Sequence, residues 1–321
     1  MVKILILPLH GIGDVLMTTP ALRRLKEGLN VRITYLHMFE TTRDILIGNP
    51  HVDENIHFPF FEARKIDCLR FLLGFRKRFN YSLNFYPSNR RSYNIAALAV
   101  SSPVRIGHRY LQDDLRELNF IKTHSFKEDD NLHCVEENLR LLEFLGVNSV
   151  EAGPLEVYLR PDEQGQARQW LKDRGLSGRL IIGIHPGSGL FKNNIERRWP
   201  ADSFIRLIKR ISSEFSEAAF LVFIGPEEKE LKDLLVSKPG DSDKIFFVEA
   251  RLIREAASII ENCKIFISND SGLMHLAAAL IVNDALVAAG LPALTLLSAD
   301  KRLLNAAQAE GLATDNPNVH P

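Results

Sequence analysis

The chain has 321 residues, of which 45% are hydrophobic and 25% charged, and its 40 Lys or Arg balance 40 Asp or Glu. This composition is typical of globular proteins and excludes disordered and collagen-like chains, while the zero net charge excludes a chain that is basic throughout. The length suits two domains of roughly 150 residues each.

Cysteine usage and hydropathy indicate the compartment. Cys68, Cys134 and Cys263 are odd in number and widely separated, so they predict neither a disulfide framework nor a metal site. No stretch reaches the ~18 consecutive apolar residues that a membrane-spanning helix needs. We therefore expect a soluble, cytoplasmic protein, for which any membrane contact is peripheral.

The first half begins with a pattern typical of a βαβ unit. Residues 2–7 form an apolar, β-branched run of strand length, which indicates a buried parallel strand. A glycine-containing loop at 10–14 precedes a helical pattern over 15–26, which Pro20 should end or kink. A second strand is predicted over 31–36. Right-handed crossover between the two strands predicts an open parallel sheet.

Residues 60–110 are the most basic part of the sequence, with ten Lys or Arg against Glu62 and Asp67, a net charge of +8. This charge indicates a groove for an anionic ligand, a solvated basic face, or a surface that touches anionic lipid headgroups. Apolar residues at 71–75 fit either a membrane contact or the buried face of a helix. The cations are Arg64, Lys65, Arg70, Arg76, Lys77, Arg78, Arg90, Arg91, Arg105 and Arg109.

The second half starts afresh after a connector rich in Pro, Gly and acidic residues at 151–165, where we place the domain boundary. Strands that alternate with helical patterns then predict a doubly wound sheet. The strands are expected over 180–185, 218–224, 245–248 and 264–268, and the helices over about 201–215, 226–236 and 251–262. Open parallel sheets bind ligands outside the carboxyl ends of their strands, so the loops there are candidate sites.

The first candidate loop holds Gly11, Gly13 and Asp14. The two glycines allow a ligand to approach the backbone, and the helix that follows aims unpaired N–H groups at the loop. Asp14 is either the N-cap of that helix or a catalytic carboxylate, and the glycine pair alone does not decide between them.

Three further loops follow strands of the second half. Ser188, Lys192 and Arg197 suit a phosphate, although a solvated basic loop has the same pattern. Glu228 either compensates a helix dipole or accepts hydrogen bonds from the hydroxyl groups of a ribose. In the fourth loop Asp270 or Ser271 can cap a helix, Gly272 allows close approach of a ligand, and His275 is either a ligand contact or a packed core histidine.

Taken in this order, the four loops resemble the ADP-heptose:lipopolysaccharide heptosyltransferases of glycosyltransferase family 9. The resemblance extends from residue 1 to about 280 and is carried by HGIGDVLMTTPALRRLK at 10–26, IHPGSG at 184–189, RRWP at 197–200, IGPEE at 224–228 and SNDSGLMHLAAAL at 268–280. It implies an α/β protein of the GT-B fold, with two Rossmann-like domains facing across a cleft. Residues 1–160 would bind the acceptor, and residues 161–321 would bind the nucleotide sugar and include an atypical tail from about 281.

The resemblance implies an inverting, metal-independent transfer of a heptose or similar sugar from a nucleotide diphosphate, such as ADP-heptose, to a lipopolysaccharide core or related cell-envelope saccharide. Asp14 falls on the family's general base, and Glu228 on the residue that holds the ribose. Arg197 falls on the family's lysine, the cation that stabilises the leaving diphosphate. The arginine puts a planar guanidinium where the family has a lysine ammonium group. The implied donor-binding residues are Gly11, Gly13, Ser188, Lys192, Arg197, Glu228, Asp270, Ser271, Gly272 and His275.

Arg64, Arg90 and Arg91 are the candidate acceptor-binding residues, because the expected acceptor carries carboxylates and phosphates. The resemblance implies no cofactor, and no Asp-x-Asp metal motif occupies a suitable loop. It implies a cytoplasmic enzyme, with peripheral contact to the inner membrane as an open alternative, and no nucleic-acid partner.

The tail after residue 280 departs from the family pattern. It is similar to the end of a PIN-domain ribonuclease, with Asp284 and Asp300 on acidic metal-site positions of that family. The rest of such a domain is missing, so we do not expect an independent nuclease. The tail keeps a second interpretation open, in which the chain is a non-catalytic nucleotide- or carbohydrate-binding protein with a degenerate donor domain.

Overall fold

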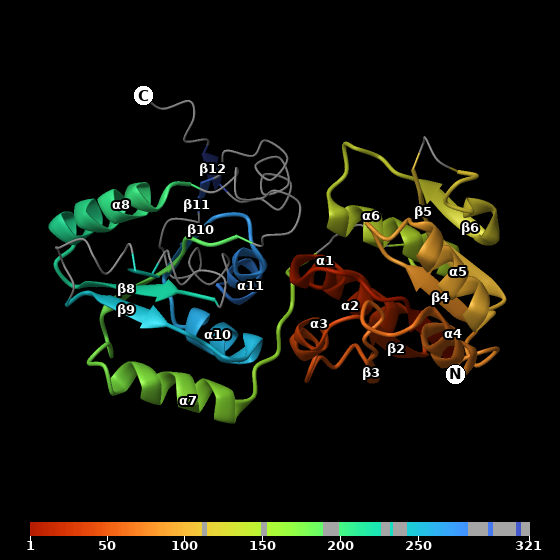
Figure 1. Ribbon diagram of the computed structural model, residues 1–321, viewed down its shortest axis with the longest axis horizontal. Helices are drawn as coiled ribbons and strands as arrows, with labels where there is room; N and C mark the ends of the chain where they lie inside the picture. Colours follow the sequence, from red (N-terminus) through yellow and green to blue (C-terminus); the bar gives the residue numbers. More distant parts are fainter. Residues whose placement is uncertain are drawn as a thin grey trace. The chain divides into compact units, whose positions relative to one another are not determined.

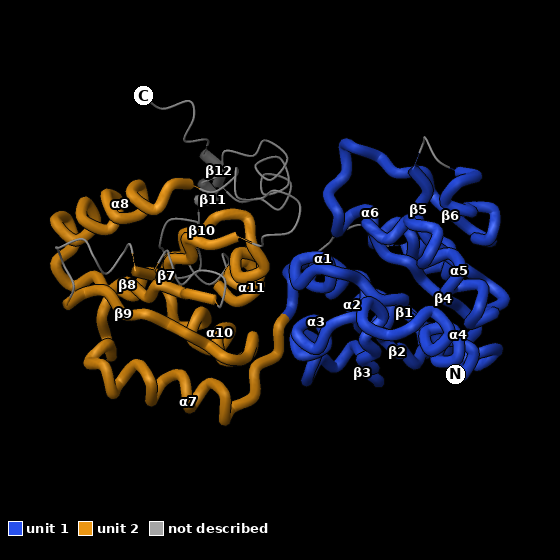
Figure 2. Tube along the Cα trace, viewed as in Figure 1, with its two compact units in different colours: residues 1–156, 286–321 blue, residues 157–285 orange. Residues whose placement is uncertain are grey.

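The computed structural model describes residues 1–110, 114–148, 153–188, 199–225, 232–233, 243–281, 295–297 and 313–315. The chain divides into two compact units (Figure 2). The first consists of Met1–Glu156 with the described part of Leu286–Pro321, and the second of Val157–Ala285. The predicted boundary at residue 160, with the tail in the second domain, stays a prediction.

The first unit is built on a six-stranded parallel sheet of order β3-β2-β1-β4-β5-β6 (Figure 1). The direction in which the strands are added reverses between β1 and β4. Leu5 of β1 lies opposite Thr34 of β2 and Ser82 of β4. The strands are β1 (Val2–Ile6), β2 (Val31–His37), β3 (Glu54–His57), β4 (Tyr81–Asn84), β5 (Val104–Arg109) and β6 (His124–Lys127).

Right-handed crossovers place α2 and α3 on one face of this sheet and α4 and α5 on the other. On the second face Leu5 and Leu36 of the strands pack against Leu72 and Ala97 of the helices. Burial of both faces explains why residues 4–6 of β1 are all apolar, as predicted for a buried parallel strand. The helices are α1 (Ile12–Leu16), α2 (Thr19–Gly28), α3 (Glu40–Ile45), α4 (Lys65–Leu73), α5 (Arg91–Val100), η1 (Asn119–Ile121), α6 (Cys134–Arg140) and η2 (Leu141–Leu145).

The helical pattern at 15–26 forms two helices, α1 and α2. The hydroxyls of Thr18 and Thr19 donate to the carbonyls of Val15 and Leu16, each at 2.7 Å, at the end of α1. Pro20 then lies in the first turn of α2, where its missing N–H leaves no intrahelical hydrogen bond unmade. The break that Pro20 predicted is confirmed.

The second unit holds a four-stranded parallel sheet of order β10-β7-β8-β9, which reverses between β7 and β10. The strands lie within one residue of the predicted ranges, and most of the helix expected at 226–236 lies outside the described residues. None of the described helices has the length and hydropathy of a membrane-spanning segment. The elements are α7 (Pro161–Lys172), β7 (Leu180–His185), α8 (Ala201–Glu214), β8 (Ala218–Phe223), β9 (Ile245–Val248), α10 (Ile253–Ile260), β10 (Ile265–Ser268) and α11 (Gly272–Leu280). A separate two-stranded sheet of β11 (Thr295–Leu297) and β12 (Ala313–Asp315) belongs to the first unit.

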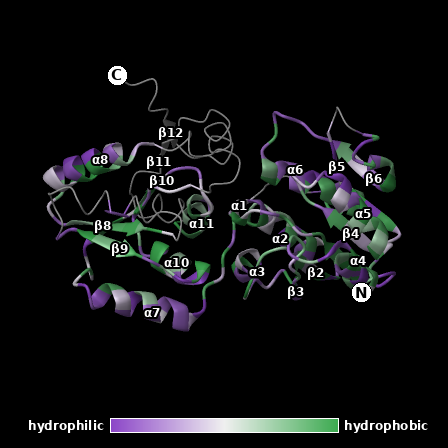
Figure 3. Cartoon of the chain, viewed as in Figure 1, coloured by the Kyte–Doolittle hydropathy of each residue, from purple (hydrophilic) through white to green (hydrophobic). Residues whose placement is uncertain are grey.

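The core of the second unit lies between its sheet and α8. Phe204 and Ile208 of α8 pack against Ile184 of β7 and against Phe220 and Val222 of β8. The strands are hydrophobic and α7 is largely hydrophilic, as Figure 3 shows. On α8, the side with Phe204 and Ile208 is buried against the sheet, and the opposite side of the amphipathic helix faces solvent.

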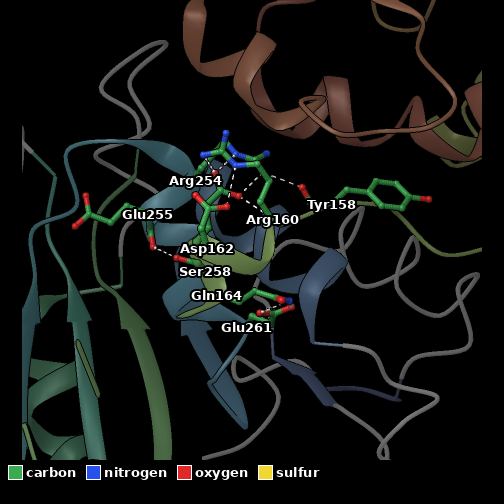
Figure 4. A network of polar contacts seen from close by, with 9 residues as sticks. Tyr158, Arg160, Asp162, Gln164, Arg254, Glu255, Ser258 and Glu261 are labelled. Atoms are coloured by element: carbon green, nitrogen blue, oxygen red, sulfur yellow. Dashed lines mark hydrogen bonds and ion pairs between the residues drawn. The ribbon is translucent and has the colours of Figure 1, made fainter. Parts of the chain in front are cut away.

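A polar network fastens α10 to α7 (Figure 4). The guanidinium of Arg254 is almost fully buried and donates to both carboxylate oxygens of Glu163, at 2.7 and 2.6 Å. It also donates to the carbonyl of Tyr158 at 2.8 Å, and Gln164 donates to Glu261 at 2.8 Å. The hydrogen bonds from Arg254 lower the pKa of Glu163. Because α10 leads directly into β10, this network fixes the strand that carries the fourth candidate loop.

We expect Arg254→Met to lower the free energy of unfolding of the second unit by about 3 kcal/mol, because the Glu163 carboxylate loses both hydrogen bonds from the buried guanidinium and keeps only its contacts with the exposed Arg160. The control is Arg210→Met, which breaks an exposed pair with Glu214 and should cost at most about 0.5 kcal/mol. Urea denaturation followed by tryptophan fluorescence measures both, since the two tryptophans lie in this unit. Equal effects of the two substitutions would contradict a structural role for the buried pair.

The same pair predicts the direction of the pH dependence. The pKa of Glu163 is lowered from its ordinary value of 4.5 on folding, so the folded state holds this carboxylate charged where the unfolded chain takes up a proton. The stabilisation is complete above pH 4.5 and is lost as the pH falls below it. Arg254→Met should flatten this acid loss, and Arg210→Met should leave it unchanged.

Candidate active site

The first site lies where the sheet of the first unit reverses, at the carboxyl ends of β1 and β4. The loops after these two strands start side by side, because the N–H of Leu7 donates to the carbonyl of Leu83 at 2.9 Å. The segments that follow β1 and β4 run toward opposite faces of the sheet, which opens a crevice between the two loops. Ligands of open parallel sheets bind in this position, and Asp14 lies there.

Asp14 is the third residue of α1, and Gly11 occupies the N-cap position, so the N-cap interpretation of Asp14 is wrong. The half-buried carboxylate instead reaches back, and its Oδ2 accepts a hydrogen bond from the backbone N–H of Gly11 at 3.0 Å. A Cβ at position 11 would lie 3.0 Å from the same oxygen, so only glycine leaves the carboxylate its full room. Gly13 is buried within the helix.

Aromatic rings from several loops line the same edge of the sheet. The Tyr93 hydroxyl and His10 Nδ1 are 2.6 Å apart and share a hydrogen bond. The ring of His10 meets the edge of Phe61 with centroids 4.9 Å apart, and Phe61 stacks on Phe39 at 5.6 Å. Phe39, Phe61, His10 and Tyr93 follow β2, β3, β1 and β4 respectively, so neighbouring strands deliver one row of rings.

The charge of Asp14 acts on three groups that are themselves uncharged at neutral pH. Burial, with a contribution from the Asp14 charge, raises the pKa of Tyr93 to about 12 and that of Cys134 to about 11. Burial and the same charge also raise the pKa of Tyr35. The two phenols and the thiol therefore stay protonated and do not neutralise the charge of Asp14.

The predicted acceptor residues Arg64, Arg90 and Arg91 lie at the amino ends of α4 and α5, on the same edge of the sheet as Asp14. Arg64 and Arg90 occupy the N-cap positions, and all three side chains are exposed. Arg64 pairs with Asp67 at 2.7 Å. Burial raises the pKa of Tyr93, and the charge of Arg90 opposes that rise.

A buried lysine supports the loop after β4. Lys122 Nζ donates to Asn89 Oδ1 at 2.5 Å, to the carbonyl of His108 at 2.6 Å and to Asn119 Oδ1 at 2.5 Å. Burial lowers the pKa of Lys122 to about 7, while the three oxygens match the three N–H groups of the protonated amine. Lys122 thereby fixes Asn89, the neighbour of Arg90 in the chain.

A second site lies where the sheet of the second unit reverses, at the carboxyl ends of β7 and β10. Asn269 connects the loops there, because its Nδ2 donates to the carbonyl of Pro186 at 2.7 Å and its Oδ1 accepts from the N–H of Trp199 at 2.8 Å. Ser188 is buried in the loop after β7. The structure therefore brings the second and fourth predicted loops together.

The amino end of α11 closes this second site. Ser271 is its N-cap and accepts a hydrogen bond from the N–H of Met274 at 3.3 Å, which decides between the two capping candidates. Asp270 precedes the cap, Gly272 begins the helix, and His275 is half-buried in its first turn. The first N–H groups of such a helix suit an anion such as a phosphate.

Several predicted residues lie outside the described residues, namely Lys192, Arg197 and Glu228 of the donor site and Asp284 and Asp300 of the tail. Within the described ranges, no three His, Cys, Asp or Glu side chains form a group that could hold a metal ion.

The sequence interpretation missed His10, Phe61, Tyr93, Lys122 and Asn269. His10 and Asn269 adjoin the predicted loops, so their positions next to glycine and to Asp270 could have drawn attention to them. The other three come from separate elements and share no spacing, and only the order of the strands brings them to this edge.

Comparison with known proteins identifies relatives. Residues 92–283, more than half of the chain, match the model of a family described as Glycosyltransferase family 9 (heptosyltransferase). The chain is 25% identical over 298 residues to lipopolysaccharide heptosyltransferase 2 of Salmonella typhimurium, which covers 87% of this chain and 80% of that protein. Its fold is similar to a glycosyl transferase family 9 structure from Veillonella parvula, with a TM-score of 0.78 and 19% identity over 98% of this chain and 86% of the other. It is also similar to Escherichia coli heptosyltransferase WaaC with ADP-2-deoxy-2-fluoro heptose, with a TM-score of 0.66 and 18% identity over 88% of this chain and 87% of the other.

These structural likenesses confirm the predicted fold class, α/β of the GT-B type with two Rossmann-like domains. Each unit has the parallel sheet with a reversal of strand order that such a domain needs. The cleft between the domains and the roles of the individual site residues stay predictions.

We expect Lys122→Met to destabilise the first unit by about 2 to 3 kcal/mol, because three buried oxygens lose their donor while the volume is kept. Lys127→Met is the matched control, since Lys127 is exposed on β6 a few residues away. Circular dichroism during thermal unfolding reports the whole chain, and tryptophan fluorescence reports the second unit alone. A loss that also appears in the fluorescence transition, or that Lys127→Met reproduces, would contradict this role of Lys122.

Proposed function

Because the chain belongs to glycosyltransferase family 9, the heptosyltransferases, we propose that it moves a heptose from ADP-heptose to a lipopolysaccharide core or related cell-envelope saccharide. The chain is a glycosyltransferase of lipopolysaccharide biosynthesis. The proposal adds the donor, inversion at the anomeric carbon, independence of metals and cofactors, and a cytoplasmic location. The observation that carries it is the position of Asp14 at the reversal point of the first sheet.

Asp14 is the proposed general base. An acceptor hydroxyl attacks the anomeric carbon of the donor sugar from the side opposite the diphosphate. The new bond joins the acceptor oxygen to that carbon, the bond to the diphosphate oxygen breaks, and the hydroxyl proton passes to the Asp14 carboxylate. Gly11 supports this role, because its N–H hydrogen-bonds Oδ2 and orients the group. A positioned base of this kind is worth about 10²- to 10⁴-fold in rate.

The second unit is the proposed donor site. The leaving diphosphate gains negative charge, which the first N–H groups of α11 and the Ser271 turn can stabilise without a metal. By the family resemblance, Arg197 and Lys192 add positive charge and Glu228 holds the ribose. The WaaC structure with an ADP-heptose analogue supports ADP-heptose as the donor.

The row of rings and the arginines of the first unit form the proposed acceptor site. The C–H groups of a pyranose ring pack on the electron-rich face of an aromatic ring, and Phe61 is 60% exposed at this edge. Arg64, Arg90 and Arg91 would bind the carboxylates and phosphates of the saccharide. Apolar faces beside cations thus match an anionic sugar better than they match an uncharged one.

A second candidate function, binding of a nucleotide or carbohydrate without turnover, rests on the atypical tail after residue 280. The structure describes only 281, 295–297 and 313–315 of that tail. The two functions differ in whether ADP is released in the presence of an acceptor.

Asp14→Asn should lower kcat for ADP release by about 10²- to 10⁴-fold, because the amide cannot take up the acceptor proton. Its amide oxygen can still accept from the Gly11 N–H, so the unfolding temperature and the KM for ADP-heptose should change little. Asp173→Asn, at an exposed position after α7, is the control and should keep full activity. The substrates are ADP-heptose and a deacylated lipopolysaccharide core oligosaccharide.

An unchanged kcat in Asp14→Asn removes Asp14 from the mechanism. ADP-heptose binding with no ADP release from the unaltered chain selects the non-catalytic function.

Chelation and stereochemistry test the rest of the mechanism. Excess EDTA should leave the rate of ADP release unchanged, since helix N–H groups and cations of the chain stabilise the leaving group. NMR of the product should show the anomeric configuration opposite to that of the donor. Activity that EDTA abolishes and Mg²⁺ restores, or retention of configuration, would refute these parts of the proposal.

A further inference from the structure

One side of the first unit carries an unusual number of exposed apolar side chains. On α4, Ile66, Leu69 and Leu73 are spaced as one stripe of a helix and are 40–48% exposed, whereas Leu72 between them is buried against the sheet. The helix therefore has two apolar sides, and only one of them contributes to the core.

The stripe continues onto the neighbouring elements. Ile95 and Leu98 of α5, which packs beside α4, are 43% and 50% exposed. The segment 114–121 packs on α5, where the Asn94 side chain donates to the carbonyl of Glu117 at 2.6 Å. This segment adds Leu115 and Phe120, which are 83% and 71% exposed. We name these three elements, 65–73, 91–100 and 114–121, the α4–α5 face.

The opposite side of the sheet lacks this feature. Among the described residues, α2 and α3 carry no large hydrophobic side chain of comparable exposure. The cations of α2 are paired, Arg23 with Glu156, Arg24 with Glu27 and Lys26 with Asp53. The apolar exposure is thus specific to one side of the unit, which the general composition of protein surfaces does not explain.

Positive charge lies at both ends of α4, with Lys65 at its start and Arg76 and Lys77 just after its end. Lys65, Arg76 and Lys77 are exposed and make no ion pair within the described residues, while Arg64 and Arg70 share the single carboxylate of Asp67. An apolar stripe bordered by unpaired cations is the pattern of a surface that lies on an anionic bilayer. There the apolar side chains enter the interfacial region and each Lys or Arg contributes about 1 kcal/mol with the anionic headgroups.

We propose that the α4–α5 face docks onto the surface of an anionic phospholipid bilayer. The inference rests on the proposed function, because a lipopolysaccharide acceptor is itself held in a membrane. The amino ends of α4 and α5 carry Arg64 and Arg90, so the docked face and the proposed acceptor site share two helices. Docking would bring that edge of the sheet to the membrane surface, where the acceptor saccharide begins.

Cosedimentation of the full chain with vesicles tests the proposal. Vesicles of phosphatidylcholine with phosphatidylglycerol should bind the chain, and vesicles of phosphatidylcholine alone should bind it far more weakly. The double variant Ile66→Ser with Leu69→Ser should lower binding to the anionic vesicles about tenfold or more, since two apolar side chains no longer enter the bilayer. Leu252→Ser is the matched control, because Leu252 is 64% exposed in the second unit and should leave binding unchanged.

A second variant tests the charge separately. Lys65→Gln with Arg76→Gln should lower binding to the anionic vesicles by roughly an order of magnitude or more and reduce its dependence on salt. Both double variants should keep the rate of ADP release with a deacylated core oligosaccharide in the absence of vesicles. This assay separates the two proposals, since vesicle binding without ADP release would contradict the enzyme function alone.

The proposal is overturned if the unaltered chain does not bind anionic vesicles, if it binds both kinds of vesicle equally, or if Leu252→Ser weakens binding as much as the double variant. It is also overturned if the apolar double variant changes the oligomeric state in light scattering and leaves vesicle binding intact, because the face would then be a protein interface.

Discussion

Each of the two large parallel sheets has one point where the order of its strands reverses, and these two points determine where the chain can hold a ligand. In the first unit the reversal separates the loops after β1 and β4, and in the second it separates those after β7 and β10. Helices leave toward opposite faces there, so the backbone opens without breaking the sheet. Asp14 lies at the first point, and the Ser271 turn lies at the second.

Buried polar contacts hold both loops in place. Lys122 gathers three oxygens and fixes the loop after β4, and Asn269 joins the loops after β7 and β10. Gly11 keeps the Asp14 carboxylate in one orientation through a single hydrogen bond. The site residues are therefore positioned by side chains that need never touch a substrate, as preorganised active sites require.

Sequence patterns predicted the features that depend on local chemistry. The apolar runs of β7 and β9, the break before Pro20 and the loops with Asp14 and Ser271 follow from residues close together in the chain. Tyr93, Phe61 and Lys122 could not be predicted, because α5, the loop after β3 and η1 meet only once the strand order is known. The structure excludes the N-cap alternative for Asp14, which lies three residues into α1 and reaches back to the N–H of the cap residue, Gly11.

A crystal structure of the chain with ADP and a core oligosaccharide tests the central claim most directly. The account predicts the diphosphate against the amino end of α11, beside Ser271, and a saccharide hydroxyl within hydrogen-bonding distance of Asp14. A nucleotide bound elsewhere in the second unit, or a saccharide that makes no contact with the Asp14 edge of the first sheet, would contradict it.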